Sequence, residues 1–344
     1  GEFTRRAFLS GRIDLAQAEA VLDIIRAKTN SALKIGVSQL KGGLSERLNT
    51  CRRILIDMLS RLEAAIDFPE EEDIFLDFKK ITDMNIRVSS LLKGLLDDSR
   101  LGRALREGVH LVICGKPNVG KSSLLNALVK KERSIVTSIP GTTRDTIEEI
   151  IDIGGIPIRV VDTAGILEPK DLVEKKAISR SKKEINSADL VIVLFDGSSK
   201  LSKEDLFLIN KLKSKRSIAV INKSDLRQKI EREKILKAFE NNVDISARRL
   251  KNIDLLEKKI TGLIYKGAII KPESVMVSNL RHIQLLLKVQ KSIAQIQKSL
   301  DNKLSVEFIA HDAREALGFL DDILGKRFSV DLLDKIFLEF CIGK

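Results

Sequence analysis

The sequence contains little of what holds secreted or membrane-spanning proteins together. Only three cysteines occur in 344 residues, Cys51, Cys114 and Cys341, and none has C-x-x-C spacing. Such wide spacing argues against disulfides and zinc sites and fits a reducing compartment. No apolar run is long enough to cross a bilayer, and the first residues do not have the pattern of a signal peptide. We therefore expect a cytoplasmic protein, whose 43% hydrophobic residues suffice for a core in each of two or three domains.

Acidic residues are scarcer than basic ones, and the imbalance is local. The net charge is +12, and residues 105–270 carry 32 Lys and Arg against 22 Asp and Glu, a net of +10. A surface that binds nucleic acid is one interpretation. A lysine-rich solvated surface is the other, and it is favoured because the lysines are spread among acids rather than gathered in one stripe.

A phosphate-binding loop is the most informative pattern present. Residues 115–122 read G-K-P-N-V-G-K-S and match G-x-x-x-x-G-K-[ST] in full. The apolar run 111–114 before them predicts a buried strand, and residues 123–128 predict a helix. Strand, glycine loop and helix together predict a phosphate site, because backbone N–H groups and the helix N-terminus converge on the anion. Lys121 is expected to reach the β- and γ-phosphates and Ser122 to bind Mg²⁺.

Three further patterns complete a guanine-nucleotide site in chain order. Asp162-Thr163-Ala164-Gly165 ends an apolar strand and predicts a metal-linked carboxylate and a γ-phosphate contact. Asn222-Lys223-Ser224-Asp225 follows another strand, and its aspartate can accept two N–H groups from guanine that adenine lacks. Ser246-Ala247 follows a third, where a backbone N–H is predicted to reach the guanine oxygen. Together they predict that the chain binds GTP.

The alternation of elements predicts the fold of this middle region. Strand-like runs at 109–114, 156–161, 190–196, 217–222 and 242–246 alternate with helical patterns at 121–130, 172–187, 203–214, 228–240 and 252–264. This βα alternation predicts a mostly parallel sheet covered on both faces, a Ras-like α/β domain. The pair Gly154-Gly155 predicts a hairpin turn and hence one antiparallel edge pair.

Both flanks of the middle region have helical patterns. Asp14 and Gln17 predict a capping box, and apolar residues at steps of three and four predict a helix over about 30–66, weakened or bent at Gly42-Gly43. Further helices are expected at about 80–104, 278–300, 304–317 and 329–340. The flanks form either two separate bundles or one bundle with the α/β domain inserted, and these patterns favour neither.

The residues that turn over GTP are less clear from pattern alone. A threonine in the loop 137–145 is expected to close on Mg²⁺ when a γ-phosphate is present. Ile166 stands where many GTPases place a water-orienting glutamine. The chain is then a poor hydrolase, borrows a partner's group, or uses another residue. Glu174 is a candidate, although an exposed first-turn helix glutamate is the ordinary interpretation of such a residue.

At the level of whole segments, the chain resembles the MnmE (TrmE) family of tRNA-modification GTPases. The resemblance rests on residues 1–9 (GEFTRRAFL), 14–20 (DLAQAEA), 65–71 (AIDFPEE), 141–145 (GTTRD) and 340–344 (FCIGK), and it runs from end to end. It implies one helical domain, residues 1–104 and 271–344, with a GTPase domain, residues 105–270, inserted. The chain starts where the family's helical domain starts, so we expect it to lack the family's N-terminal folate-binding domain.

The resemblance also implies how GTP is hydrolysed. Hydrolysis would depend on K⁺ and on face-to-face pairing of two GTPase domains. Asn118 would bind K⁺ with help from Thr142 and the carbonyls of Thr137 and Ile139. Mg²⁺ would be held by Ser122 and Thr143, and Glu174 would orient the attacking water.

The nucleotide contacts expected in all are Gly115, Asn118, Val119, Gly120, Lys121, Ser122, Ser123, Thr137, Ser138, Ile139, Pro140, Gly141, Thr142, Thr143, Asp162, Thr163, Ala164, Gly165, Asn222, Lys223, Asp225, Ser246, Ala247 and Arg248.

The family's chemistry implies partners and a second site. With the FAD-dependent protein MnmG, its members modify the wobble uridine of certain tRNAs at C5, adding a carboxymethylaminomethyl or aminomethyl group with a folate one-carbon unit. Arg12 and Lys344 are similar to family positions near the folate, and Cys341 matches the cysteine tied to the modification. No membrane partner is implied.

Two other functions compete with this one. An Era-type GTP-switched RNA-binding or ribosome-assembly factor would carry a KH-like module or a basic stripe after the GTPase domain. Residues 271–344 instead have helical patterns and are nearly neutral, which counts against it. A scaffold in which GTP only pairs two chains is the third reading, and it predicts binding without hydrolysis.

Overall fold

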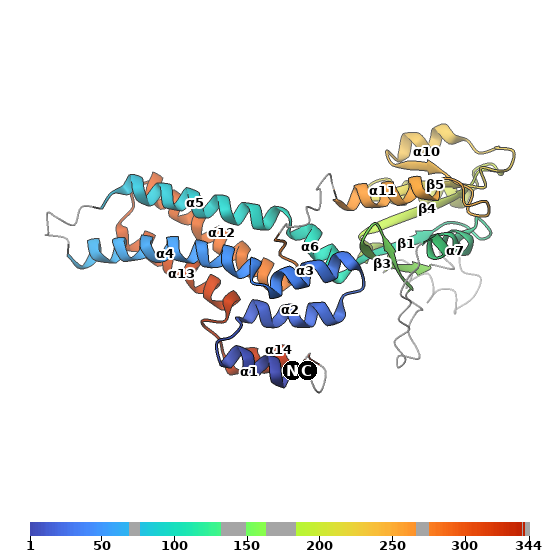
Figure 1. Ribbon diagram of the computed structural model, residues 1–344. Coiled ribbons are helices and arrows are strands. Elements are labelled where there is room, and N and C mark those ends of the chain that lie inside the picture. Colours follow the sequence, from blue (N-terminus) through green and yellow to red (C-terminus); the bar gives the residue numbers. More distant parts are fainter. Residues whose placement is uncertain (69–75, 132–148, 163–183, 266–274, 339, 341–344) are drawn as a thin grey trace, which may run out of the picture. The chain divides into compact units, whose positions relative to one another are not determined.

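The chain folds into two compact units, residues 1–106 together with 268–344, and residues 107–267. The computed structural model describes residues 1–68, 76–131, 149–162, 184–265, 275–338 and 340, and the rest of the chain stands outside this description. The first unit is built of helices, and the second of a sheet with helices (Figure 1). Because both ends of the second unit join the first, an α/β domain is inserted into an all-α domain.

Nine helices lie in the described part of the first unit. They are α1 (Glu2–Leu9), α2 (Leu15–Arg26), α3 (Asn30–Leu40), α4 (Gly43–Asp67), α5 (Phe78–Asp97), α6 (Ser99–Glu107), α12 (Leu280–Asp301), α13 (Val306–Leu324) and α14 (Val330–Leu338).

The long helices α4, α5, α12 and α13 pack side by side as a bundle (Figure 1). The apolar residues of α4 that recur at steps of three and four, from Leu44 to Leu62, are fully buried in it. Burial of one such leucine stabilises the fold by about 1.5–3 kcal/mol, so the stripe holds α4 in place. Three of the other helices, α1, α2 and α14, share a smaller core around Leu15, Phe8 and Phe337.

Two predicted helices are each divided in the structure. The single helix expected over 30–66 was wrong, because α3 ends at Leu40 and α4 begins at Gly43. Gly42 sits between them at φ +90°, a left-handed conformation that glycine adopts without steric cost. The helix expected over 80–104 is likewise two helices, α5 and α6. The capping box of α2 is confirmed, because the Asp14 carboxylate accepts from the backbone N–H of Gln17 and the Gln17 side chain accepts from that of Asp14.

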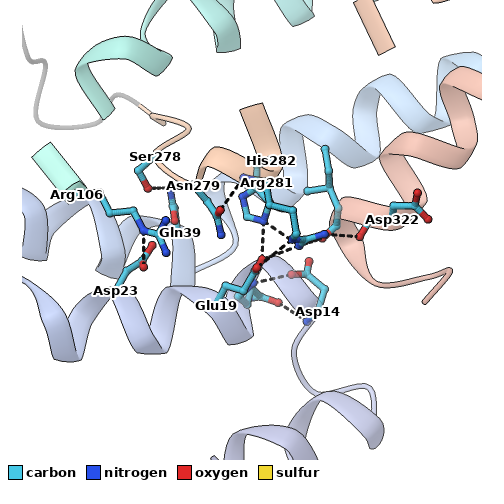
Figure 2. Close-up of polar contacts among 12 residues, drawn as sticks. Asp14, Glu19, Asp23, Gln39, Arg106, Ser278, Asn279, Arg281, His282 and Asp322 are labelled. Atoms are coloured by element: carbon cyan, nitrogen blue, oxygen red, sulfur yellow. Dashed lines mark hydrogen bonds and ion pairs between the residues drawn. The ribbon is translucent and has the colours of Figure 1, made fainter. Parts of the chain in front are cut away.

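A buried charged cluster joins α2 to α12 and α13 (Figure 2). Glu19 of α2 accepts from Nε and Nη2 of Arg281 at 3.0 and 2.7 Å, and its Oε2 lies 2.6 Å from Nε2 of His282. Arg281 also donates from Nη1 to the backbone carbonyl of Asp322 at 3.0 Å. Burial alone would raise the pKa of Glu19, but His282 and Arg281 outweigh it and hold that pKa at about 2.

Polar contacts also anchor the last helix before the α/β unit. Arg106 at the end of α6 donates from Nε to Asp23 of α2 at 2.7 Å, and Gln39 of α3 donates to the hydroxyl of Ser278 at 3.1 Å (Figure 2). Gln39 also donates to the carbonyl of Met276 at 2.7 Å. Burial raises the pKa of Asp23, and the nearby Arg106 only partly offsets this. Helices far apart in the sequence are thus tied together by specific hydrogen bonds as well as by apolar packing.

The described residues of the second unit form one six-stranded sheet of order β2-β3-β1-β4-β5-β6. Its strands are β1 (Val109–Cys114), β2 (Glu149–Ile153), β3 (Ile156–Asp162), β4 (Leu190–Asp196), β5 (Ser217–Asn222) and β6 (Asn242–Asp244). All neighbours are parallel except β2 and β3, which pair antiparallel around Gly154-Gly155. The predicted parallel sheet with an antiparallel edge is therefore confirmed.

Helices cover both faces of this sheet. They are α7 (Lys121–Lys131), α9 (Lys203–Leu212), α10 (Arg232–Ala238) and α11 (Ile253–Tyr265). The central strands β1, β4 and β5 are buried on both faces, as expected when helices lie on each side of a parallel sheet. The helical pattern at 228–240 was too long, because α10 spans only seven residues. No helix among the described residues has the length and apolarity that crossing a membrane requires.

Candidate guanine-nucleotide site

The phosphate loop leaves the carboxyl end of β1 and enters α7 at Lys121. Gly120 has φ +101°, and a Cβ there would lie 2.4 Å from Nδ2 of Asn222. At Gly115 a Cβ would lie 2.5 Å from the carbonyl oxygen of Leu194 in β4. Both glycines of the motif are thus required by close approach of neighbouring groups, and the loop follows the tight path that brings its N–H groups together.

Lys121 and the two serines after it occupy the first turn of α7. The Lys121 ammonium donates to the carbonyls of Gly115 and Lys116 at 3.0 and 3.1 Å. It therefore lies across the loop that is predicted to bind the phosphates. Ser122 and Ser123 are exposed. The first N–H groups of a helix lack intrahelical acceptors, so this turn can receive phosphate oxygens while the Ser122 hydroxyl remains accessible to Mg²⁺.

Asn222, at the end of β5, connects the phosphate loop to the loop after β6. Its Nδ2 donates to the carbonyl of Val119 at 2.8 Å, and its Oδ1 accepts from the backbone N–H of Ala247 at 3.0 Å. The side chain is buried. Pattern reasoning predicted Asn222 as a nucleotide contact and Ala247 N–H as a guanine donor. In the structure, the Asn222 side chain links the two loops by hydrogen bonds, and it accepts the Ala247 N–H itself.

Lys223 and Asp225 complete the guanine motif. Lys223 has φ +63°, and its ammonium lies 2.6 Å from Oδ2 of Asp196 at the end of β4. Burial raises the pKa of Asp196, but hydrogen bonds from Lys223 and Ser198 outweigh it and lower the pKa. Asp225 is exposed, and a hydrogen bond from the Ser246 side chain is the main reason that its pKa is lowered. An ionised, accessible carboxylate is what recognition of two guanine N–H groups requires.

Asp162 is the last residue of β3 and pairs in register with Ile113 of β1. Parallel neighbours end at the same edge of the sheet, so the backbone of Asp162 reaches the edge at which the phosphate loop begins. Arg248 lies exposed in the turn after β6, beside Ala247.

The remaining predicted residues lie outside the described part of the chain. They are Thr137, Ser138, Ile139, Pro140, Gly141, Thr142, Thr143, Thr163, Ala164, Gly165, Glu174, Cys341 and Lys344. Within the described part no cluster of His, Cys, Asp and Glu is arranged to hold a metal. The predicted Mg²⁺ site therefore rests on Ser122 and on phosphate oxygens, with Thr143 as the expected second protein ligand.

Arg12, the described residue of the predicted folate site, lies in the helical unit. It is exposed and lines a shallow pocket of about 400 Å³ between the turn after α1 and the turn after α13, together with Lys326 and Phe328. Two cations beside an aromatic ring can receive an anionic aromatic ligand.

Comparison with known proteins identifies the family. The family model described as the MnmE helical domain matches residues 15–341. The protein named tRNA modification GTPase MnmE of Clostridioides difficile (strain 630) is 46% identical over 346 residues, which cover 100% of this chain and 75% of that protein. The protein of the same name from Alkaliphilus oremlandii (strain OhILAs) is 43% identical over 348 residues, with the same two coverages. The chain belongs to the MnmE family.

Membership confirms the resemblance inferred from the sequence. The fold class is confirmed too, since the described residues form a mostly parallel sheet with covering helices, inserted into helices that the MnmE helical model matches. The relatives are longer than this chain, which spans three quarters of their length. MnmE proteins are GTPases by name, and this chain carries the phosphate-loop and guanine-motif sequences described above.

Proposed function

We propose that this chain is the GTPase of a tRNA wobble-uridine modification system, and that its hydrolysis is activated by K⁺ when two GTPase domains pair. That it is a GTPase of tRNA modification follows from its membership of the MnmE family. One observation carries the assignment to a guanine nucleotide: buried Asn222 ties the phosphate loop to the loop of Ala247 and lies three residues before the exposed Asp225. One side chain therefore connects the loop proposed to bind the phosphates with the loop proposed to bind the base.

The described residues supply binding and orientation. Asp225 accepts the guanine N–H groups, and the ammonium of Lys223, in the same motif, is held by Asp196. The N–H groups of the loop and of the α7 first turn receive the phosphates, and Lys121 exchanges its two loop carbonyls for phosphate oxygens. Mg²⁺ held by Ser122 and Thr143 would neutralise charge that develops on those oxygens during hydrolysis.

Five residues are proposed for the chemical step. Glu174 orients the attacking water in the absence of a glutamine at Ile166. A K⁺ ion held by Asn118, Thr142 and the carbonyls of Thr137 and Ile139 would supply the positive charge that an arginine finger gives in other GTPases. Asn118 is exposed and has φ +62°, so its side chain is available at the surface where a second domain would approach.

The finer biological role is proposed from the family. The partners would be an MnmG-type FAD protein and tRNA, and the product a carboxymethylaminomethyl or aminomethyl group at C5 of the wobble uridine. Arg12 and Lys344 would contribute to a folate site, and Cys341 to the modification. The described residues after the α/β unit form helices α12 to α14, and no observation among them favours the Era-type alternative.

Single substitutions separate binding from catalysis. Glu174→Ala is expected to keep GDP and GTP affinity while steady-state hydrolysis falls by about 100-fold or more, since water orientation is lost but no binding contact is. Asn118→Ala is expected to remove the difference between rates in KCl and NaCl. Unchanged turnover in Glu174→Ala would contradict the catalytic assignment, and retained K⁺ stimulation in Asn118→Ala would contradict the cation site.

A further inference from the structure

The phosphate loop is held from outside at two points, and the proposed function uses only one. Asn222 holds its second half through the carbonyl of Val119. The first half is held by Lys116, the residue after Gly115, which no nucleotide motif assigns a role. Its side chain reaches the first turn of α9, where it meets Asp205.

The Lys116–Asp205 contact is a buried ion pair. Nζ of Lys116 lies 2.9 Å from Oδ2 of Asp205 and 3.5 Å from Oγ of Ser199. The Asp205 side chain is 2% exposed and that of Lys116 is 17% exposed. An ion pair withdrawn from water has a well-defined geometry and is costly to break on one side only.

The carboxylate of Asp205 is itself fixed before Lys116 reaches it. Oδ2 accepts from the backbone N–H and from the hydroxyl of Ser202, each at 2.9 Å, in the capping box that starts α9. The backbone N–H of Asp205 in turn donates to the Ser202 hydroxyl. The acceptor is therefore rigid, and Lys116 is anchored to the end of a helix rather than to a mobile surface group.

The segment that Lys116 anchors is the first half of the loop that is proposed to surround the phosphates. The carbonyls of Gly115 and Lys116 are the two acceptors of the Lys121 ammonium. Next to them, Asn118 has φ +62°, a conformation uncommon for a residue other than glycine. Such backbone persists where its surroundings determine it, and here one anchor lies on each side: Lys116 before Asn118 and Val119 after it.

We propose that Asp205 is a positioning residue for nucleotide binding. Through its ion pair with Lys116, it fixes the first half of the phosphate loop in the conformation that receives the β-phosphate, without touching the nucleotide. The inference rests on the proposed guanine-nucleotide site and adds a residue from α9 to it. Because the anchor acts on the phosphate loop and the base is held by residues 222–225, its loss weakens the contribution of the phosphates and spares that of guanine.

The test compares GDP with GMP, which differ by the β-phosphate. Dissociation constants are measured by competition with a fluorescent GDP derivative for wild type, Lys116→Met, Asp205→Asn and Lys116→Arg. Lys116→Met keeps the aliphatic stem, and Asp205→Asn keeps an acceptor for Ser202. We expect both to weaken GDP binding about 10-fold and GMP binding less than twofold, since one charge-assisted contact is lost. Lys116→Arg keeps the charge and is expected to restore most of the GDP affinity.

Controls separate positioning from stability. Arg232→Gln removes the ion pair between Arg232 and Asp244 (2.7 Å), which lies in the same domain and is more exposed. It is expected to leave both dissociation constants unchanged. The double variant Lys116→Met/Asp205→Asn leaves no unpaired buried charge, so it serves where a single variant folds poorly, and it is expected to show the same selective loss for GDP.

The ratio of the two affinities decides the outcome. Folded variants that keep the wild-type ratio of GDP to GMP affinity would overturn the inference, even if they unfold at a lower temperature. An equal loss for both nucleotides would also overturn it, because that is the signature of a merely structural role. A wild-type chain that binds neither nucleotide would overturn the proposed function itself, and the inference with it.

Discussion

Each of the two units contains a buried polar network. One network joins helices, and the other holds a loop. In the helical unit, Glu19, Arg281 and His282 join regular helices whose backbone is already satisfied. In the α/β unit, Asn222 and the Lys116–Asp205 pair hold the loop between β1 and α7, which is neither strand nor helix. The first network adds stability and fixes how helices meet. The second holds the phosphate loop in the conformation that we propose binds the nucleotide. Substitutions should therefore affect folding in one unit and binding in the other.

The largest effect is expected where the nucleotide site recognises guanine. Asp225→Asn replaces an acceptor of two guanine N–H groups by a side chain that also donates. We expect GTP affinity to fall by about 10⁴-fold, because the N–H groups of bound guanine are left mispaired, and xanthosine triphosphate, which offers an oxygen at that place, to bind better than GTP. Nucleotide competition measures both. Retained preference for GTP would mean that Asp225 does not read the base, and unchanged urea unfolding would show that the fold is intact.

In the helical unit the corresponding substitution should act on stability. Glu19→Ala leaves Arg281 and His282 without their buried partner, and we expect the free energy of unfolding to fall by about 3–5 kcal/mol. Urea titration followed by circular dichroism measures it. Fluorescent GDP should bind the folded variant as it binds wild type. A variant that loses GDP affinity but no stability would reverse the comparison between the two units.

Acid should weaken the same cluster. The pKa of Glu19 is about 2 in the folded chain against an ordinary 4.5, so its contribution is fully present above about pH 4.5 and is lost as pH falls toward 2. That difference corresponds to about 3 kcal/mol. The raised pKa of Asp23 acts in the opposite direction, since its protonation in the folded chain favours folding in acid.

A matched variant isolates the contribution of Glu19. Because Glu19→Gln removes the titrating group, the unfolding free energy of wild type should fall more steeply than that of the variant between pH 5 and pH 3. Parallel pH profiles for the two proteins would show that Glu19 is not the acid-sensitive group.

The smallest effect is expected on the bundle surface. Asp57 and Arg61 form an exposed ion pair one turn apart on α4, with Oδ1 and Nε 3.0 Å apart. Exposed pairs of this kind contribute about 0.3–0.5 kcal/mol, so Asp57→Asn should change the unfolding free energy by no more than that. Thermal unfolding of Asp57→Asn and Glu19→Ala, measured side by side, compares the stability lost with an exposed ion pair to that lost with the buried cluster. A loss of several kcal/mol in Asp57→Asn would mean that exposure is a poor guide to the cost of breaking a pair here.

Local chemistry could be predicted from the sequence because it acts over a few residues. The phosphate loop, the strand before it and the helix after it depend on residues 109–131, and all three are where the pattern placed them. The capping box of Asp14 and the hairpin at Gly154-Gly155 are equally local, and both are confirmed. The short helix α1 was not predicted as a helix, because its eight residues make only about two turns, too few for a helical period to be recognised.

Long-range contacts could not be predicted. Nothing near Asn222 in the sequence indicates that it bridges Val119 and Ala247, since these lie 103 and 25 residues away. Lys116 resembles any solvated lysine until the fold brings α9 beside the phosphate loop. The pattern at 30–66 failed for a related reason: apolar spacing continues across Gly42-Gly43, where the sequence predicted a weakened or bent helix, and the left-handed backbone of Gly42 instead separates two helices.

The central claim is that a phosphate site built by the described loop becomes an efficient hydrolase only when K⁺ and a second GTPase domain complete it. Steady-state GTP hydrolysis measured in KCl and in NaCl at equal ionic strength, over a range of protein concentration, tests it most directly. The account predicts strong stimulation in KCl, with a rate per molecule that rises with protein concentration. Equal slow rates in both salts, independent of concentration, would contradict it.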